Sequence, residues 1–99
     1  MPLHIAIVGC GAVAQRLYRQ PIQRLEKRGV IRVVALVDPV VEHADALRRY
    51  FPRARHRVQL DPAALDGVAL TLILSPAHLH CSHTLDALQA GSHVLCEKP

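Results

Sequence analysis

The chain has 99 residues, of which 51% are hydrophobic and 20% charged, and its formal net charge is +4. This length fits one domain of ordinary size, and the composition is too apolar for a disordered chain. The longest apolar run, 68–74, is far shorter than the ~20 residues that cross a membrane. Aromatic residues are 3% of the chain, too few for the base-stacking surfaces of nucleic-acid-binding proteins. We therefore expect neither a membrane nor a nucleic-acid partner, and the mild positive charge suits an anionic small molecule.

The cysteine content indicates a reducing compartment. Three cysteines, Cys10, Cys81 and Cys96, are odd in number and lack Cys-x-x-Cys spacing, so neither a disulfide framework nor a zinc ribbon is predicted. The first residues carry no basic segment of the kind that opens a secretory signal. These features together favour a cytoplasmic protein.

The first half of the chain predicts strand, helix, strand and helix. The β-branched run Leu3–Val8 indicates a buried strand that ends at a glycine-containing turn, 9–14. Apolar residues at helical spacing continue as far as Gly29, and we expect Pro21 to kink or restart that helix because proline lacks an N–H. The run 31–37 predicts a second buried strand. It is followed by a helix whose apolar face carries Val41, Ala44 and Leu47.

The second half continues this alternation. The segment 57–60 is too short to assign, and Asp61-Pro62 is a good N-cap and first-turn pair for a short helix through Leu65. The run 68–74 gives the clearest strand, and 93–96 predicts a last one. A helix over 80–90 carries on one face Cys81, Thr84, Leu85 and Leu88. Because strands alternate with helices throughout, we predict an α/β fold, a doubly wound parallel sheet of about five strands with helices on both faces.

The turn after the first strand has the pattern Gly9-x-Gly11-x-x-Ala14, in the strand–turn–helix context of a dinucleotide-binding fingerprint. The first glycine permits the tight turn, the second lets the backbone approach a pyrophosphate, and the alanine lets helix and strand pack closely. Free N–H groups at the helix start favour that anion. The candidate cofactor-binding residues of this turn are Gly9, Cys10, Gly11, Ala12, Val13 and Ala14.

Asp38 is the second part of this fingerprint. It follows the second strand, 24 positions after Ala14, close to the ~20-residue offset of the acid that binds the ribose. The ordinary explanation is an N-cap aspartate before Pro39, but the agreement of two positions favours the ribose site. Methyltransferases that use S-adenosylmethionine share this layout. They usually carry an acidic residue just before the glycines, where this chain has Ile7-Val8.

Asp38 also predicts which cofactor is preferred. A carboxylate at this position accepts hydrogen bonds from ribose hydroxyls and repels the 2′-phosphate of NADP. Pro39 and Val40 supply no cation to offset that repulsion. We therefore expect NAD to be preferred over NADP.

Two clusters of charged or metal-ligating residues have ordinary explanations. Five arginines lie within ten positions, and a solvated helix end and loop is the more common reason for such a run than a nucleic-acid patch. Three histidines, 78, 80 and 83, suggest a metal site, but apart from Cys81 no thiolate or carboxylate is spaced to complete it. We therefore predict no metal. The five arginines of the run described above are Arg48, Arg49, Arg53, Arg55 and Arg57.

The segment 71–99 contains a further ordered set of motifs, namely Ser75-Pro76, His80, Ala90-Gly91, His93-Val94 and Glu97-Lys98-Pro99. In order and spacing, these motifs resemble those of the Gfo/Idh/MocA family of NAD(P)-dependent oxidoreductases. With the glycine turn and Asp38, the resemblance spans the whole chain. The chain departs from the family at Ser75, where threonine is commoner, and at Ala77, where asparagine is often found.

The resemblance implies that residues 1–99 form the NAD(P)-binding Rossmann domain of an oxidoreductase whose second, substrate-holding α/β domain is absent from this chain. It implies hydride transfer to or from a sugar, polyol or related hydroxyl or carbonyl substrate, with the cofactor supplying the chemistry. Lys98 would be catalytic, and further cofactor contacts would come from Ser75, Pro76, His80 and Glu97. Without the family, Glu97-Lys98 would be read as a solvated charge pair. A non-catalytic NAD-binding regulatory module is the alternative function.

Three expectations follow for the chain by itself. It should bind cofactor without dehydrogenase activity, because the substrate must be held against the nicotinamide by a second domain. The strand 93–96 should leave an unpaired edge that favours association of copies of the chain. In the full-length context, the resemblance suggests a cis peptide between Lys98 and Pro99.

Overall fold

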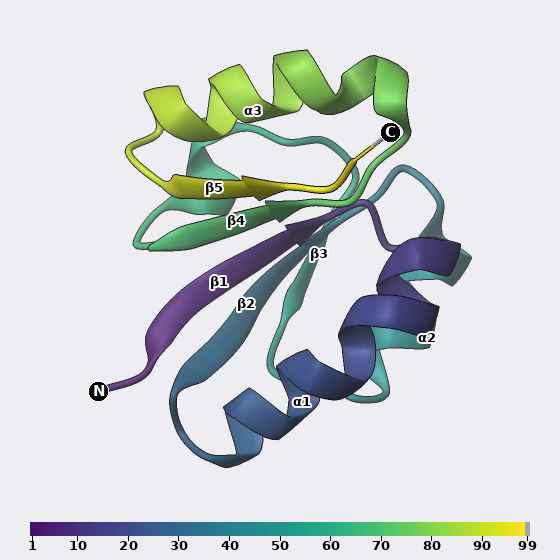
Figure 1. Cartoon of the computed structure of the whole chain (residues 1–99), viewed down its shortest axis with the longest axis vertical. Coiled ribbons are helices and arrows are strands. Elements are labelled where there is room, and N and C mark those ends of the chain that lie inside the picture. The colour runs from purple at the N-terminus through teal and green to yellow at the C-terminus, as the bar shows by residue number, and fades with distance from the viewer. Residues whose placement is uncertain (99) are drawn as a thin grey trace.

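The computed structural model describes residues 1–98 and contains one fully parallel sheet in the order β3-β2-β1-β4-β5 (Figure 1). The predicted doubly wound sheet is therefore confirmed. The short β3 ends at Arg57, the first residue of the segment 57–60 that the sequence pattern left unassigned. The strands are β1 (Leu3–Val8), β2 (Ile31–Val37), β3 (Arg55–Arg57), β4 (Leu70–Ile73) and β5 (His93–Cys96).

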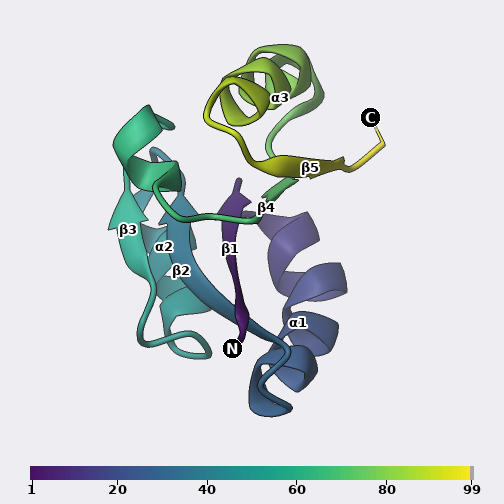
Figure 2. The same ribbon diagram turned by 90° about the vertical axis from the view of Figure 1, so that its left-hand side faces the viewer.

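Helices cover both faces of the sheet (Figure 2). A buried cluster on one face joins Ile5 and Ile7 to the helices α1 and α2 through Ile22 and Leu47. The cluster on the other face includes Ala6 of β1 and joins the sheet to η2 and α3. The helical elements are η1 (Ala14–Tyr18), α1 (Arg19–Lys27), α2 (Val41–Arg48), η2 (Pro62–Leu65), η3 (Ala77–Leu79) and α3 (His80–Gln89).

The first helix changes from π to α geometry two residues before Pro21, in agreement with the expected kink or restart. The turn ahead of it, η1, is π-helical, and the Arg19 N–H donates to the Ala14 carbonyl oxygen five residues back. Proline has no N–H to donate to the carbonyl of Leu17, and the wider π turn accommodates that missing bond. The chain therefore continues directly from η1 into α1, which ends where Gly29 adopts φ +77°.

The predicted apolar face of the 80–90 helix is wrong in phase. Cys81, Leu85 and Leu88 are exposed, and the buried residue of α3 is Ala87. A small side chain at that position lets the helix lie close to the sheet, so the leucines point to solvent. Val41 was also predicted to face the core but is 48% exposed.

Asp61 begins the short helix η2. The predicted N-cap Asp61 is confirmed, since its Oδ1 accepts from the Ala64 N–H at 2.8 Å. Within residues 1–98, none of the helices has the length and apolar character needed to cross a membrane. The Lys98–Pro99 peptide, for which a cis isomer was suggested, lies outside the described residues.

Candidate cofactor-binding site

A cleft of about 880 Å³ opens at the carboxyl ends of the strands. The strand order reverses here, because the chain runs from β1 outward to β2 and β3 and then returns to β4 on the other side of β1. Ligands of open α/β sheets bind at such a point. The wall includes four segments that carry predicted site residues, namely the turn 9–13, Asp38-Pro39, the segment 74–80 and Glu97-Lys98.

Most of the predicted site residues line this one cleft, although they come from both ends of the chain. They are Gly9, Gly11, Ala12, Val13, Asp38, Ser75, Pro76, His80, Glu97 and Lys98. Cys10 and Ala14 do not line it, because both are buried beneath the turn. The sequence pattern missed further wall residues, which include Val40, His43, Val58, Leu60 and His83.

The two glycines of the turn serve different purposes. Gly9 has φ +93°, and a Cβ there would lie 2.4 Å from the Ser75 backbone nitrogen, so only glycine lets β1 and β4 end side by side. Gly11 needs neither a positive φ nor close packing. A Cβ on Gly11 would meet nothing nearer than the His43 ring, at 3.9 Å. The fold itself does not require glycine at this position, and the free space faces the cleft.

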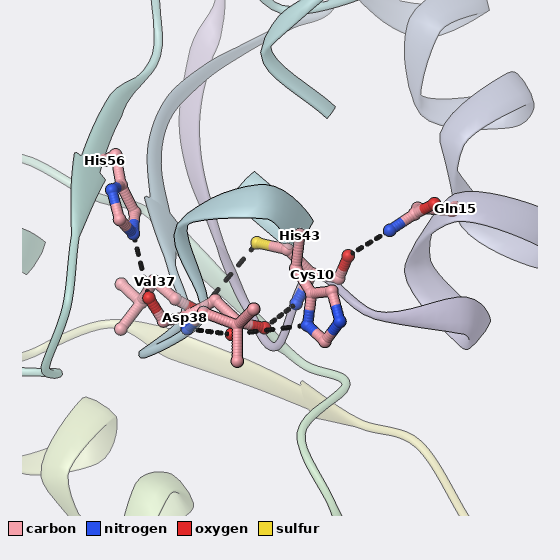
Figure 3. A network of polar contacts seen from close by, with 7 residues as sticks. Cys10, Gln15, Val37, Asp38, His43 and His56 are labelled. Carbon is pink, nitrogen blue, oxygen red and sulfur yellow. Dashed lines mark hydrogen bonds and ion pairs between the residues drawn. The ribbon is translucent and has the colours of Figure 1, made fainter. Parts of the chain in front are cut away.

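Asp38 is held firmly between three segments (Figure 3). One carboxylate oxygen accepts from the Cys10 N–H and the other from the Val40 N–H, each at 2.8 Å. The Asp38 carbonyl oxygen accepts from His56 Nε2 at 2.8 Å. The residue is 6% exposed and has no unpartnered oxygen. Its carboxylate therefore lies in a fixed orientation in the cleft wall, and each oxygen keeps lone pairs for a ligand.

Cys10 acts as a structural residue of the glycine turn. Burial, together with the neighbouring Asp38 carboxylate, raises the pKa of the Cys10 thiol to about 12. The thiol therefore stays protonated and unreactive at neutral pH. The backbone of the same residue is held on both sides, because its carbonyl oxygen accepts from Gln15 Nε2 at 2.8 Å and its N–H binds Asp38.

Ser75, at the end of β4, is bound by two histidines of α3. The Ser75 hydroxyl hydrogen-bonds to His83 Nδ1 at 2.8 Å, and the Ser75 carbonyl oxygen accepts from His80 Nε2 at 2.5 Å. Burial lowers the pKa of His83. These bonds hold the β4–α3 connection, which includes Ser75, against α3. Across residues 1–98, no three His, Cys, Asp or Glu side chains are grouped so as to hold a metal ion.

The Glu97-Lys98 end of the cleft is tied to the first helix. The Tyr18 hydroxyl donates to the Glu97 carboxylate, and the other Glu97 oxygen accepts from the Lys98 N–H at 2.8 Å. The Tyr18 bond, followed by the Lys98 bond, lowers the pKa of Glu97. Among the described residues of the cleft wall, Lys98 is the only lysine or arginine.

The arrangement suits a long, partly anionic ligand. Backbone N–H groups at the start of a helix attract an anion at the glycine turn. A fixed carboxylate accepts hydroxyl donors on one side of that turn, and a lysine lies at the other end of the cleft. The free space at Gly11 lets a ligand approach the backbone, so the residues present fit a dinucleotide.

Comparison with known proteins agrees with this geometry. The family model described as "Oxidoreductase family, NAD-binding Rossmann fold" matches residues 3–99. The chain belongs to the Gfo/Idh/MocA oxidoreductase family. This membership decides against the methyltransferase alternative.

Relatives within the Gfo/Idh/MocA family act on sugars and inositols. The chain is 36% identical over 104 residues to D-glucoside 3-dehydrogenase of Escherichia coli, with 99% of this chain and 27% of that protein covered. It is 36% identical over 101 residues to inositol 2-dehydrogenase of Burkholderia multivorans, with 100% of this chain and 29% of that protein covered. The chain thus spans less than a third of the length of these relatives.

Solved structures of the family contain both nicotinamide cofactors. A 3-ketoreductase from Actinomadura kijaniata, in complex with NADP and TDP-benzene, superposes with a TM-score of 0.79 at 32% identity, covering 100% of this chain and 30% of that one. The WlbA dehydrogenase of Thermus thermophilus, in complex with NAD and α-ketoglutarate, gives 0.74 at 26% identity, covering 98% and 33%. Family membership alone therefore does not decide between NAD and NADP.

Proposed function

We propose that this chain is the cofactor-binding part of an oxidoreductase and binds NAD in the cleft. The pyrophosphate lies on the N–H groups of the 9–13 turn, and the adenosine ribose lies on Asp38. The observation that carries this proposal is the space at Gly11, which the fold leaves open without any structural need. The fixed carboxylate of Asp38 supports it independently.

The same carboxylate supports a preference for NAD over NADP. It lies in a rigid wall whose two N–H bonds prevent it from turning away from a ligand. A 2′-phosphate placed against it would meet a like charge, at a cost of about 1–4 kcal/mol for charges near 4 Å apart. The ribose hydroxyls of NAD would instead donate to it.

For the whole protein, we propose that residues 1–99 form one NAD(P)-binding domain and that a second domain holds a sugar, polyol or related substrate. The bound cofactor supplies hydride transfer. Lys98 is the proposed catalytic residue, and its place at the cleft wall next to Glu97 supports this role. Ser75, Pro76 and His80 would contact the cofactor near its nicotinamide end.

The cofactor assignment is tested by calorimetric titration of the chain with NAD and NADP. Wild-type chain should bind NAD more tightly, and Asp38→Asn should bring the two affinities close together, because it removes the charge and keeps the shape. Circular dichroism of the variant controls for folding. Equal affinities in wild type, or an unchanged ratio in Asp38→Asn, would contradict the role of Asp38.

The catalytic role needs a second experiment. The 99-residue chain should form no NADH from a panel of sugars and polyols, since hydride transfer requires the substrate to be held ~3–3.5 Å from the cofactor. In a longer protein with a substrate domain, Lys98→Ala should abolish turnover and preserve NAD binding. A protein that binds NAD and turns over no substrate even with Lys98 intact would favour the regulatory alternative.

A further inference from the structure

His43 lines the cleft but belongs to none of the sequence motifs. It lies on the first turn of α2, and its side chain is 45% exposed. Its Nδ1 lies 3.5 Å from Asp38 Oδ1, and its ring is the group nearest to the position of a Cβ on Gly11. Figure 3 shows the ring beside the Asp38 carboxylate, at the glycine turn.

This position lies between the two proposed contacts of the cofactor. A ribose that bridges Asp38 and the glycine turn must lie against the His43 ring, because the ring neighbours both. Any group attached to the 2′-oxygen would meet the same ring while it approaches the Asp38 carboxylate. Pro39 and Val40 offer no charge here, so among the described residues that line the cleft beside Asp38, His43 is the one whose side chain can carry a positive charge.

We propose that His43 is a specificity-determining residue that makes the choice between NAD and NADP depend on pH. The proposal rests on the proposed NAD site. Neutral imidazole leaves the Asp38 carboxylate uncompensated, so NADP is rejected. Imidazolium offsets that carboxylate and faces the 2′-phosphate, so NADP is tolerated. Histidine is the side chain whose charge can change within the pH range in which proteins work.

The other charged groups around His43 do not duplicate this effect. Glu42 precedes it on α2, and His56 reaches the Asp38 carbonyl from β3. The Cys10 thiol in the glycine turn stays neutral because its pKa is raised to about 12. Asp38 is the carboxylate that the ring contacts. His80 lies near Glu97, at the Lys98 end of the cleft.

The 2′-phosphate itself has a pKa near 6, so the affinity for NADP changes with pH even without His43. The experiment must measure this background change separately. As pH falls, NADP loses one negative charge and is repelled less by Asp38, with or without His43. His43→Gln keeps this background and removes the titrating cation. His43→Arg supplies a cation at every pH. The His43 side chain is 45% exposed, so both variants should fold.

The experiment is calorimetric titration of NAD and NADP into wild type and both variants, at about pH 8 and about pH 6 and constant ionic strength. From the higher to the lower pH, the NAD:NADP affinity ratio of wild type should fall ~5–10-fold further than that of His43→Gln. His43→Arg should bind NADP more tightly than wild type at pH 8, with no pH dependence beyond that background. His93→Gln, which changes an exposed histidine at the amino end of β5, away from the cleft, should behave as wild type.

The outcomes separate this inference from the function on which it rests. If NAD binds, and the ratio changes with pH equally in wild type and His43→Gln, the selectivity role of His43 is overturned and the site at Asp38 stands. If wild type binds neither cofactor at either pH, both fail. If His43→Arg leaves NADP affinity at pH 8 unchanged, the ring does not face the 2′-position, which also overturns the inference.

Discussion

The Asp38 end and the Lys98 end of the cleft differ in how firmly the fold holds them. β2, which leads to Asp38, has the burial pattern of a central strand, with five of its seven residues buried. β5, which leads to Lys98, is an edge strand with none of its four residues buried. The Asp38 carboxylate accepts from two backbone N–H groups, whereas Glu97 is tied to η1 by one side-chain bond, from the Tyr18 hydroxyl.

This contrast indicates what each end contributes to binding. A rigid carboxylate distinguishes a hydroxyl from a phosphate without rearrangement, so the Asp38 end is suited to recognition. The Lys98 end lies on exposed chain and can be adjusted by whatever packs against it. We therefore expect substitutions at the Asp38 end to change cofactor affinity and unfolding free energy strongly. Substitutions at the Lys98 end should mainly change the ionisation of nearby side chains.

The largest effect is expected within the glycine turn itself. Gly9→Ala places a Cβ within 2.6 Å of three backbone atoms and forces a side chain on a φ of +93°, so it should cost at least about 3 kcal/mol of unfolding free energy. Gly11→Ala should leave stability within about 0.5 kcal/mol and weaken NAD binding. Urea unfolding and calorimetry measure the two. Equal loss of stability in both variants would remove the distinction between a fold glycine and a ligand glycine.

The helices that pack beside each end allow a second comparison. Leu47 of α2 is fully buried, so Leu47→Ala should destabilise the chain by about 2–5 kcal/mol. Leu88 of α3 is 53% exposed, so Leu88→Ala should change stability by less than about 0.5 kcal/mol. Thermal and urea unfolding measure both. A large loss in Leu88→Ala would mean that α3 buries its leucine face.

A smaller, pH-dependent effect is expected at His83. Burial lowers its pKa in the folded state below the ordinary 6.5, so folding favours the neutral ring. This contribution is complete above pH 6.5 and is lost as pH falls through the lower, folded pKa. Because the ring is partly solvated, we expect less than about 0.5 kcal/mol. His83→Gln should flatten that part of the stability curve, whereas replacing the exposed His78 should not.

The smallest effect is a local change of charge at the Lys98 end. Tyr18→Phe removes the hydroxyl that is the main cause of the lowered pKa of Glu97. The pKa of Glu97 should therefore rise toward its ordinary value, as an NMR titration of the carboxyl carbon would show. Tyr50→Phe, which changes the other tyrosine, is the matched control. An unchanged pKa in Tyr18→Phe would mean that Glu97 is not bound to the helix.

The sequence pattern predicts the central strands well, because the mainly apolar runs Leu3–Val8 and 31–37 are mostly buried in a parallel sheet. It fails for β3, whose three residues, Arg-His-Arg, carry no apolar signal and pair only at an edge. The phase of α3 was also missed. A helix at the edge of a small sheet buries one alanine and leaves its leucines exposed, contrary to the hydrophobic pattern.

In the candidate site too, some residues could be predicted from the sequence and others could not. Motif spacing identified the glycine turn and Asp38, because that chemistry requires particular residues at fixed offsets. It could not identify His43, which lies five residues after Asp38, on the first turn of α2, and belongs to no motif. Its proximity depends on how α2 packs against the sheet. The register shift between Ile5 and Ala6, which resets the alternation of β2, likewise has no local sequence signal.

The most direct test of the account is a backbone amide NMR titration of the chain with NAD. We predict that the largest shifts fall on the turn 9–13, on Asp38 and Val40, and on Ser75, with smaller shifts toward Lys98. The exposed leucine face of α3 should not respond. Shifts centred on that face or on the arginine-rich segment 48–57, or an absence of shifts at the glycine turn, would contradict the assignment of this cleft to the cofactor.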